Sequence, residues 1–486
     1  MRKNANKSKK RPRPEAQVIY QDQWSSKRKL PLGTRLGLYE PLPMGAPSST
    51  RQQEASLLAV APAPTTHKGL IFGINPDTGW PVIHDPFAAY DDPRTGVTNA
   101  NCAFIGDIGK AKSSGIKTWG ILRPLLMGRN CVVVDKKYQK NTGEGEYAPL
   151  CRLLGKEPIV MSVARRDENG SLIATGSCIN VLDPSITVTT SGDTSPASQM
   201  TLLRTISQEA LGRELTPKEG EALNVAHDRT LQDCKAEGRV PTIRILLDRL
   251  LNPVEGDSAS SRITAAELFE WGLDLALALK RMVDSDLAGL IDGETSENIE
   301  LGDGLTVFDV SRLPESGPAL SIVMVVINTW LTNRIASRPN SISTYFIIEE
   351  AWHLVRGSVA TVIERNMKLS RGLGLGCIFA FHHYSDVPPG SPAQAILKEC
   401  DTIVLYGQKR KSDAQAVVEN YDLPPSFYRD ILTQPTGTAK LKIGTLPPIT
   451  AQHLRSPLEV TLTNTDAAMK LKKVNLAEVL DLESAA

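Results

Sequence analysis

The sequence predicts an α/β protein whose core is an open, mainly parallel β-sheet, with a helical insertion between its strands. Short apolar runs rich in Val and Ile alternate with longer segments of helical period, a pattern typical of parallel strands buried on both faces. Between about residues 198 and 282 the apolar residues keep helical spacing, which predicts the insertion. With 486 residues, 41% of them hydrophobic, the chain can hold two or more domains with a sizeable core.

The segment 103–114 carries the strongest chemical signal, because an apolar strand there runs into a glycine-bearing loop followed by Lys and Ser. The loop follows the phosphate-binding pattern G-x-x-x-x-G-K-[ST], except for Ala111 at the last glycine. In such a loop the backbone N–H groups bind phosphates, Lys112 reaches the terminal ones and the Ser113 hydroxyl holds Mg²⁺. Taken alone, Lys112 and Ser113 could equally be the first residues of an ordinary helix. The candidate nucleotide-binding residues are Gly106, Asp107, Ile108, Gly109, Lys110, Ala111, Lys112, Ser113 and Ser114.

The sequence around this loop has the expected context. A helix is predicted over residues 112–126, with Pro124 as a kink and Gly128 as a stop. Residues 131–135 follow as a short β-branched run, which predicts a buried strand. Strand, loop, helix and strand together fit a βαβ unit of about 30 residues.

A second nucleotide motif is predicted at residues 345–352, an apolar strand that ends in Glu349 and Glu350. In a P-loop ATPase the first acid orients water on Mg²⁺, and the second takes a proton from the attacking water. We therefore expect Glu349 to share a Mg²⁺ ion with Ser113, and Glu350 to act as the catalytic base. The alternative is a solvated strand end. Together the two motifs predict a RecA-like P-loop ATPase that takes ATP and Mg²⁺.

The remaining elements follow from local signals. Residues 76–79 suit a tight turn between strands at 70–74 and 80–84, and Pro217 suits a helix start. Further strands are expected at residues 157–163, 305–310, 377–381 and 402–406, a strand end or turn at 179–184, and helices at 200–211, 243–251, 265–282 and 319–335. The predicted segments are a basic, Pro-rich tail and linker at 1–66, the first part of the core at 67–197, the helical insertion at 198–300, the second part of the core at 301–460, and a tail or amphipathic helix at 461–486.

Composition excludes several classes. The net charge of +1 does not indicate a global surface for polyanions, although the basic N-terminal tail could contact nucleic acid, anionic lipid or an acidic partner instead of remaining solvated. The longest strongly apolar stretch, residues 319–327, is shorter than the roughly 18 residues that cross a bilayer, so no spanning segment is expected. No apolar segment follows the basic tail as in a secretory signal. The seven cysteines lack metal-ligand spacing and favour a reducing cytosol.

From residue 69 to residue 444 the order of motifs resembles the ATPase module of the TraC-like conjugation ATPases of type IV secretion systems, within the wider HerA–FtsK group. The residues that carry the resemblance are Gly73-Ile74-Asn75-Pro76 with Gly79, Asp85-Pro86-Phe87, Asp135 with Tyr138, Asn180-Val181-Leu182-Asp183-Pro184, Glu349-Glu350-Ala351-Trp352 and Ser385-Asp386.

The resemblance implies ATP hydrolysis, a homo-hexamer, and a cytoplasmic place at the inner face of the cell membrane, with secretion-channel proteins as partners and DNA as a further contact. The large N-terminal domain of full-length relatives is missing, so we expect a separate polypeptide to replace it. His382 stands where relatives have a glutamine that senses the γ-phosphate; a neutral imidazole both donates and accepts, but a strand-end histidine bonded to backbone is the alternative. Arg371 resembles an arginine finger, and a helix-ending cation before Gly372 is equally consistent.

Three functions are consistent with these observations. The first is a motor ATPase that energises channel assembly or transport in a conjugative secretion system. The second is a coupling protein that pumps DNA, a class that commonly carries N-terminal membrane helices. The third is a nucleotide-binding structural subunit that hydrolyses little, which the departures at Ala111, Glu349 and His382 suggest.

Overall fold

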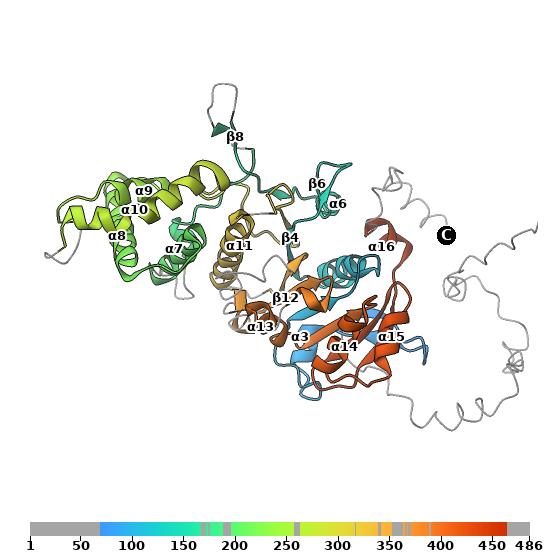
Figure 1. Ribbon diagram of the computed structural model, residues 1–486. Helices are drawn as coiled ribbons and strands as arrows, with labels where there is room; N and C mark the ends of the chain where they lie inside the picture. The colour runs from blue at the N-terminus through green and yellow to red at the C-terminus, as the bar shows by residue number, and fades with distance from the viewer. Residues whose placement is uncertain are drawn as a thin grey trace, which may run out of the picture. The chain divides into compact units, whose positions relative to one another are not determined.

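The structure is a computed structural model that describes residues 69–463, apart from 167–171, 174, 188–195, 257–262, 316, 339–341, 352–362, 365–366, 368–370 and 388–389 (Figure 1). The tail predicted at 1–66, Trp352 and most of the segment 461–486 lie outside the described residues.

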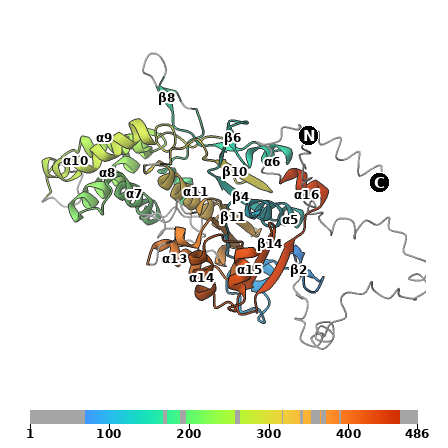
Figure 2. The same cartoon turned by 45° about the vertical axis from the view of Figure 1, so that its right-hand side comes forward.

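One mixed sheet organises the described chain, in the order β2-β1-β15-β14-β13-β3-β12-β11-β4-β10-β7. The run from β13 to β7 is parallel throughout, and β14, β15, β1 and β2 extend it with antiparallel pairs. Figure 2 shows β4, β10 and β11 side by side in the parallel part. The strands are β1 Ile71–Ile74, β2 Pro81–Ile83, β3 Cys102–Ile105, β4 Asn130–Asp135, β7 Ile159–Val160, β10 Leu305–Asp309, β11 Thr344–Ile348, β12 Leu375–Phe381, β13 Thr402–Tyr406, β14 Thr438–Ile443 and β15 Ile449–His453.

The central strands are apolar on both faces, as a covered parallel sheet requires. In β3, Phe104 belongs to one buried cluster, whereas Ala103 and Ile105 belong to a second cluster. Helices complete both clusters. They are α3 Pro86–Tyr90, α4 Lys112–Gly115, η2 Ile116–Leu122, α5 Arg123–Leu126, α6 Ala148–Leu153, η3 Pro184–Thr187, α7 Pro196–Leu211, α8 Pro217–Glu237, α9 Ile243–Leu251, α10 Ala265–Arg281, η4 Met282–Asp286, α11 Ala319–Ala336, η6 Tyr384–Asp386, α13 Pro392–Lys398, α14 Lys411–Asn420, α15 Phe427–Thr433 and α16 Pro457–Leu462. Two short hairpins lie outside the sheet, β5 Tyr138–Gln139 with β6 Glu144–Gly145 and β8 Arg165–Arg166 with β9 Leu172–Ile173.

The helix after the phosphate loop differs from the expected uniform α-helix with a kink. It begins as α4, widens into the π-helical segment η2 and returns to α-helix in α5. Pro124 lacks an N–H and therefore cannot bond the carbonyl of Gly120, four residues earlier. The N–H of Arg123 instead bonds the carbonyl of Thr118, five residues earlier, which is the π pattern. The proline therefore lies where the helix changes its hydrogen-bond pattern.

Helices α7, α8, α9 and α10 form the helical insertion between β7 and β10 (Figure 1). Contacts join α8 to α9, α10 to α9 and α10 to α8. The α8 start matches the prediction: Pro217 occupies the first turn, and the side chain of Thr216 accepts a hydrogen bond from the N–H of Glu219.

Helix α11 is long and apolar enough to cross a membrane by length and composition, and 67% of it is buried inside the fold. Trp330 on this helix packs edge-on against Phe308 of β10, with ring centroids 5.4 Å apart. Its apolar surface therefore belongs to the core beside the sheet.

One expectation about elements was wrong in part, one was confirmed, and one pair of strands was not predicted. The strand expected at 157–163 is paired only at Ile159–Val160. Residues 179–184 form a turn that enters η3, one of the two alternatives. The antiparallel pair β14 and β15 was not predicted, because the alternating Lys440 and Lys442 mask its apolar face.

Candidate nucleotide-binding site

The candidate site lies where four neighbouring parallel strands end. In the sheet, β3 is followed by β12, β11 and β4, so their C-terminal ends meet at one edge. The residues that come directly after the first three of these strands are Gly106, His382 and Glu349. Open α/β sheets bind their ligands at this edge.

The phosphate loop has the backbone that its pattern requires. Ala111 adopts φ 70° and ψ 23°, the left-handed conformation for which the standard motif supplies glycine. Gly109 also has a positive φ of 82°. At Gly106 an added Cβ would lie 2.4 Å from the Cβ of Tyr406, so this position requires glycine for close packing on β13. The loop therefore reaches its conformation despite Ala111, at the cost of local strain.

Lys112 is buried at the centre of the site. Its Nζ donates to the carbonyls of Phe381 at 2.7 Å and Gly106 at 3.1 Å, and lies 2.9 Å from Nδ1 of His382. Burial lowers the pKa of Lys112 to about 8, although the charges of Glu349 and Glu350 oppose this shift. When it is protonated, the Lys112 side chain can pair with the negative charge of a nucleotide.

Ser113 and Glu349 form the second contact of the site. The Ser113 hydroxyl donates to Oε2 of Glu349 at 3.1 Å, and the Tyr147 hydroxyl donates to Oε1. Glu349 is 3% exposed, and burial together with the charge of Glu146 raises its pKa. Mg²⁺ prefers oxygen ligands and is often held by one or two protein groups together with phosphates and water. The oxygens of Ser113 and Glu349 fit that requirement.

Glu350 contacts His382, which in turn contacts Lys112. The Nε2 atom of His382 is 2.9 Å from Oε2 and 3.1 Å from Oε1 of Glu350. Glu350 has φ 57°, an uncommon conformation for a residue with a side chain. Strained backbone of this kind is frequent at functional sites. The structure therefore brings His382, Glu350 and Lys112 into one chain of contacts.

The other predicted loop residues have distinct surroundings. Asp107 is 2% exposed, whereas Ile108 is 72% exposed at the tip of the loop. The Nζ atom of Lys110 donates to the carbonyl of Gln434 at 3.0 Å. The ammonium group of Lys110 therefore contacts a different part of the chain from that of Lys112. Ser114 is buried and lies in the first turn of α4.

A buried charge network supports the site, and the sequence analysis did not predict it. The side chain of Glu146 is 3% exposed, and its carboxylate lies 2.8 Å from Nζ of Lys117 and 2.5 Å from Nζ of Lys137. Tyr147 follows directly and contacts Glu349. Asp135, at the end of β4, accepts from the N–H of Tyr147 at 2.7 Å, and burial raises its pKa to about 8. Lysine within an apolar helical stretch, as at position 117, was the one available signal for this network.

Arg371 is not part of this site within the same chain. It precedes β12, whereas the site lies after the C-terminal ends of the parallel strands, so Arg371 belongs to the opposite edge of the sheet. Its side chain is exposed, and its guanidinium lies 5.9 Å from the ring centre of Tyr90. A role for Arg371 toward a neighbouring subunit stays a prediction.

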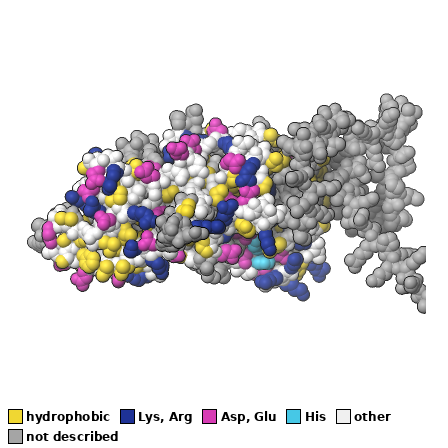
Figure 3. Space-filling model, turned by 90° about the horizontal axis from the view of Figure 1, so that it is seen from above, with side chains coloured by type: hydrophobic (Ala, Val, Ile, Leu, Met, Phe, Trp, Pro, Cys, Tyr) yellow, Lys and Arg dark blue, Asp and Glu magenta, His cyan; other side chains and the backbone are white. Residues whose placement is uncertain are grey.

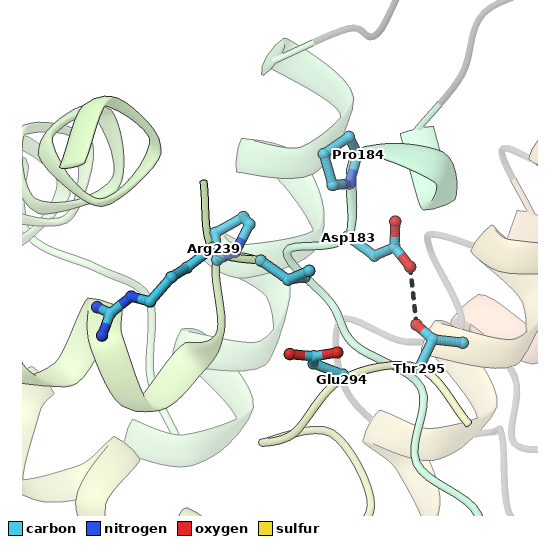
Figure 4. Close-up of a pocket in the computed structure, with 7 residues that line it drawn as sticks. Asp183, Pro184, Arg239, Glu294 and Thr295 are labelled. Carbon is cyan, nitrogen blue, oxygen red and sulfur yellow. Dashed lines mark hydrogen bonds between the residues drawn. The ribbon is translucent and has the colours of Figure 1, made fainter. Parts of the chain in front are cut away.

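The motif at residues 180–184 also lies away from the phosphate loop. Asp183 and Pro184 line a pocket with Arg239, Glu294 and Thr295, and the Thr295 hydroxyl donates to Asp183 (Figure 4). The pocket joins the loops at the start, middle and end of the helical insertion. Asn180, which is fully buried, strengthens this joint, because its Nδ2 donates to the carbonyl of Pro241 at 2.8 Å and its Oδ1 accepts from the N–H of Leu182. The motif therefore has a structural role.

Comparison with known proteins supports the fold. The solved structure of VirB4 from Thermoanaerobacter pseudethanolicus matches with a TM-score of 0.64 and 20% identity, over 81% of this chain and 98% of that chain. The plasmid coupling protein TrwB in complex with the ATP analogue ADPNP matches at 15% identity over 81% of this chain and 96% of that chain, with a TM-score of 0.48. No protein-family model matches the sequence, and a search of curated proteins gives no match. The chain has the fold of the VirB4 structure, which confirms the predicted α/β architecture.

Proposed function

We propose that the protein binds ATP with Mg²⁺ and hydrolyses it as a motor of a conjugative type IV secretion system. The observation that carries this proposal is the meeting of Lys112, Ser113, Glu349, Glu350 and His382 at one edge of the sheet. Residues far apart in the sequence supply the phosphate-binding and acidic groups that P-loop chemistry requires. The fold shared with VirB4 supports the secretion context.

Each group has a defined task in hydrolysis. The backbone N–H groups of the loop would bind the phosphates, and Lys112 would exchange its bonds to Gly106 and Phe381 for the β- and γ-phosphates. Ser113 and Glu349 would hold Mg²⁺, which supplies positive charge beside those phosphates.

Glu350 would take the proton from the attacking water. His382 contacts both Glu350 and Lys112, so it can orient that water against the γ-phosphate in place of the family's glutamine. The buried network of Lys117, Glu146 and Tyr147 would keep Glu349 in place.

The working assembly belongs to the same proposal. A homo-hexamer would let Arg371 of one subunit reach a neighbour's nucleotide, in keeping with its exposed place away from its own phosphate loop. The expected location is the cytoplasmic face of the cell membrane, with secretion-channel proteins and a separate polypeptide in place of the N-terminal domain as partners. Acidic and basic side chains are interspersed on the face shown in Figure 3, which does not favour a broad DNA-binding surface there.

A weakly hydrolysing nucleotide-binding subunit is the second candidate. The strained Ala111 favours it, because a loop of this kind is costly to hold in the nucleotide-binding conformation.

Steady-state ATP turnover, measured with and without single- and double-stranded DNA, separates these functions. Turnover that is abolished by Lys112→Ala and indifferent to DNA is the expected result. Turnover that rises strongly with DNA would instead identify a DNA-pumping coupling protein. ATP binding without turnover would identify the structural subunit.

A further inference from the structure

A second group of polar side chains includes one residue of the phosphate loop and has no task in the hydrolysis proposed above. It consists of Asp107 in the loop, His383 directly after His382, and Asp413 in the first turn of α14. Asp107 and Asp413 are each 2% exposed. Two buried carboxylates facing one imidazole is an expensive arrangement unless the groups pair with one another.

Asp107 fastens the phosphate loop to the neighbouring strand ends. Its Oδ2 accepts a hydrogen bond from the N–H of Lys409 at 2.7 Å, and its own N–H donates to the carbonyl of Gly407 at 3.1 Å. Both contacts lie just after β13. Its remaining oxygen, Oδ1, lies 2.9 Å from Nδ1 of His383, just after β12. A single loop residue therefore connects the ends of two strands.

His383 extends this connection to α14. Its Nδ1 lies 3.6 Å from Oδ2 of Asp413, whose Oδ1 accepts from the N–H of Ser385. The backbone of His383 is extended, with φ −126° and ψ 149°, and its N–H donates to Asp386 at 2.8 Å. Consecutive side chains in extended backbone point to opposite sides. His382 therefore contacts Lys112 while His383 contacts Asp107.

The atoms with which the three side chains of this cluster face one another are buried and make no well-aligned hydrogen bond. Among the described residues, Asp107 Oδ1, His383 Nδ1 and Asp413 Oδ2 are all buried polar atoms without such a bond. A proton on Nδ1 of His383 is the donor that the cluster offers to Asp107 Oδ1. Leaving a buried carboxylate oxygen without a donor costs free energy.

We infer that His383 is a positioning residue that holds the phosphate loop in its nucleotide-binding conformation by linking Asp107 to α14 through Asp413. The inference rests on the proposed function, because the loop must bind nucleotide for its conformation to matter. One short segment then carries both His382, which faces the γ-phosphate position, and the support of the loop that binds the other phosphates. Loss of the link affects phosphate binding rather than the chemical step.

The test compares two substitutions at position 383. His383→Leu removes the donor and is expected to weaken ADP binding and raise the KM for ATP by about tenfold, with kcat within about twofold of the parent. His383→Asn places an amide N–H near the position of Nδ1 and is expected to bind ADP within about twofold of the parent. This split between KM and kcat, with rescue by asparagine, distinguishes positioning from a general loss of structure.

His227→Leu is the matched control. His227 is also buried beside an aspartate, with Nδ1 3.4 Å from Asp228, but lies in α8 of the helical insertion. The His227→Leu substitution should lower the stability of the protein and leave its affinity for ADP unchanged. Asp413→Asn tests the cluster from α14 if His383→Leu does not fold; it keeps the shape and is expected to weaken ADP binding about threefold.

If the His383→Leu protein folds, three results would overturn the inference. These are ADP binding by folded His383→Leu equal to the parent, an equal loss in His227→Leu, or a loss confined to kcat. A parent protein that binds neither ADP nor ATP would contradict the proposed function itself, which is a separate outcome of the same titration. If His383→Leu does not fold, parent-like ADP affinity in Asp413→Asn overturns the inference.

Discussion

At the residue scale, two positions of the site have a backbone that their side chains disfavour. Ala111 and Glu350 have φ values of 70° and 57°, and both lie at the edge of the sheet that carries the candidate site. The sequence shows that Ala111 departs from the glycine pattern. Whether the loop then changes shape or keeps a strained backbone at Ala111 depends on the contacts that the loop makes with the rest of the fold. Among these contacts are those of Asp107 with His383, after β12, and with Lys409, after β13.

Ala111→Gly should stabilise the protein. Glycine adopts the left-handed conformation without the Cβ clash, so the free energy of unfolding should rise by about 1 kcal/mol. Gly109→Ala is the matched control, because Gly109 has φ 82° and no atom within 4 Å of its added Cβ. Gly109→Ala should lower the free energy of unfolding by about 1 kcal/mol. Urea unfolding measures both, and an Ala111→Gly midpoint at or below the parent's would show that Ala111 carries no strain.

Lys112 predicts a dependence of stability on pH. Its pKa is lowered from 10.5 to about 8 by burial, so between these values the native lysine has lost its proton while the unfolded one keeps it. The unfolded state then binds more protons, and the free energy of unfolding should rise with pH across this window by on the order of 3 kcal/mol relative to Lys112→Met. Below pH 8 the charged lysine costs its full burial penalty. Parallel stability curves for parent and Lys112→Met from pH 8 to 10.5 would refute the shift.

At the scale of elements, the sequence predicts what local pattern determines. The strands β3, β4, β10, β11, β12 and β13 and the helices α7, α9, α10 and α11 were expected within a few residues, whereas only the start of α8 at Pro217 was predicted. The π-helical segment η2 was not predicted, because it depends on Pro124 and on the packing of buried Trp119 and Ile121 against the sheet. The network of Glu146 and Tyr147 was also not predicted, because its segment of the sequence shows neither helical nor strand spacing of apolar residues.

Asn180→Ala tests the structural role of the motif at 180–184. It leaves the carbonyl of Pro241 and the N–H of Leu182 without their partners in a buried place, so stability should fall by about 1–3 kcal/mol. ADP affinity should stay at the parent value, because the phosphate loop is not involved. Asn252→Ala, at an exposed helix end, should stay within about 0.5 kcal/mol. A selective loss of ADP binding in Asn180→Ala would place the motif in the nucleotide site.

At the scale of the whole molecule, Arg371 and the candidate site of the same chain lie at opposite edges of the sheet. An arginine finger from a neighbouring subunit contributes about 10³–10⁵ in rate where it operates. The proposed hexamer would bring such an arginine to each nucleotide. The sequence alone could place Arg371 before a strand, but only the parallel pairing shows that it cannot reach its own phosphate loop.

Mixing two inactive variants tests this assembly. Arg371→Ala and Lys112→Ala should each be inactive alone, and turnover should return when they are mixed, because some sites then pair an intact loop with an intact arginine. Specific activity of the parent should also rise with protein concentration. Turnover that is independent of concentration, or parent-like activity in Arg371→Ala, would leave Arg371 as a helix-ending cation.

The central claim is that the loop at Lys112 and the acids at Glu349 and Glu350 form one ATP-hydrolysing site. Binding of ATP and its turnover, measured together in Lys112→Ala, Glu350→Gln and the control Lys110→Ala, test it most directly. The account predicts that Lys112→Ala loses ATP binding, that Glu350→Gln binds ATP but does not hydrolyse it, and that Lys110→Ala, whose side chain points to Gln434, keeps most of both. Parent-like binding and turnover in Lys112→Ala and Glu350→Gln would contradict it.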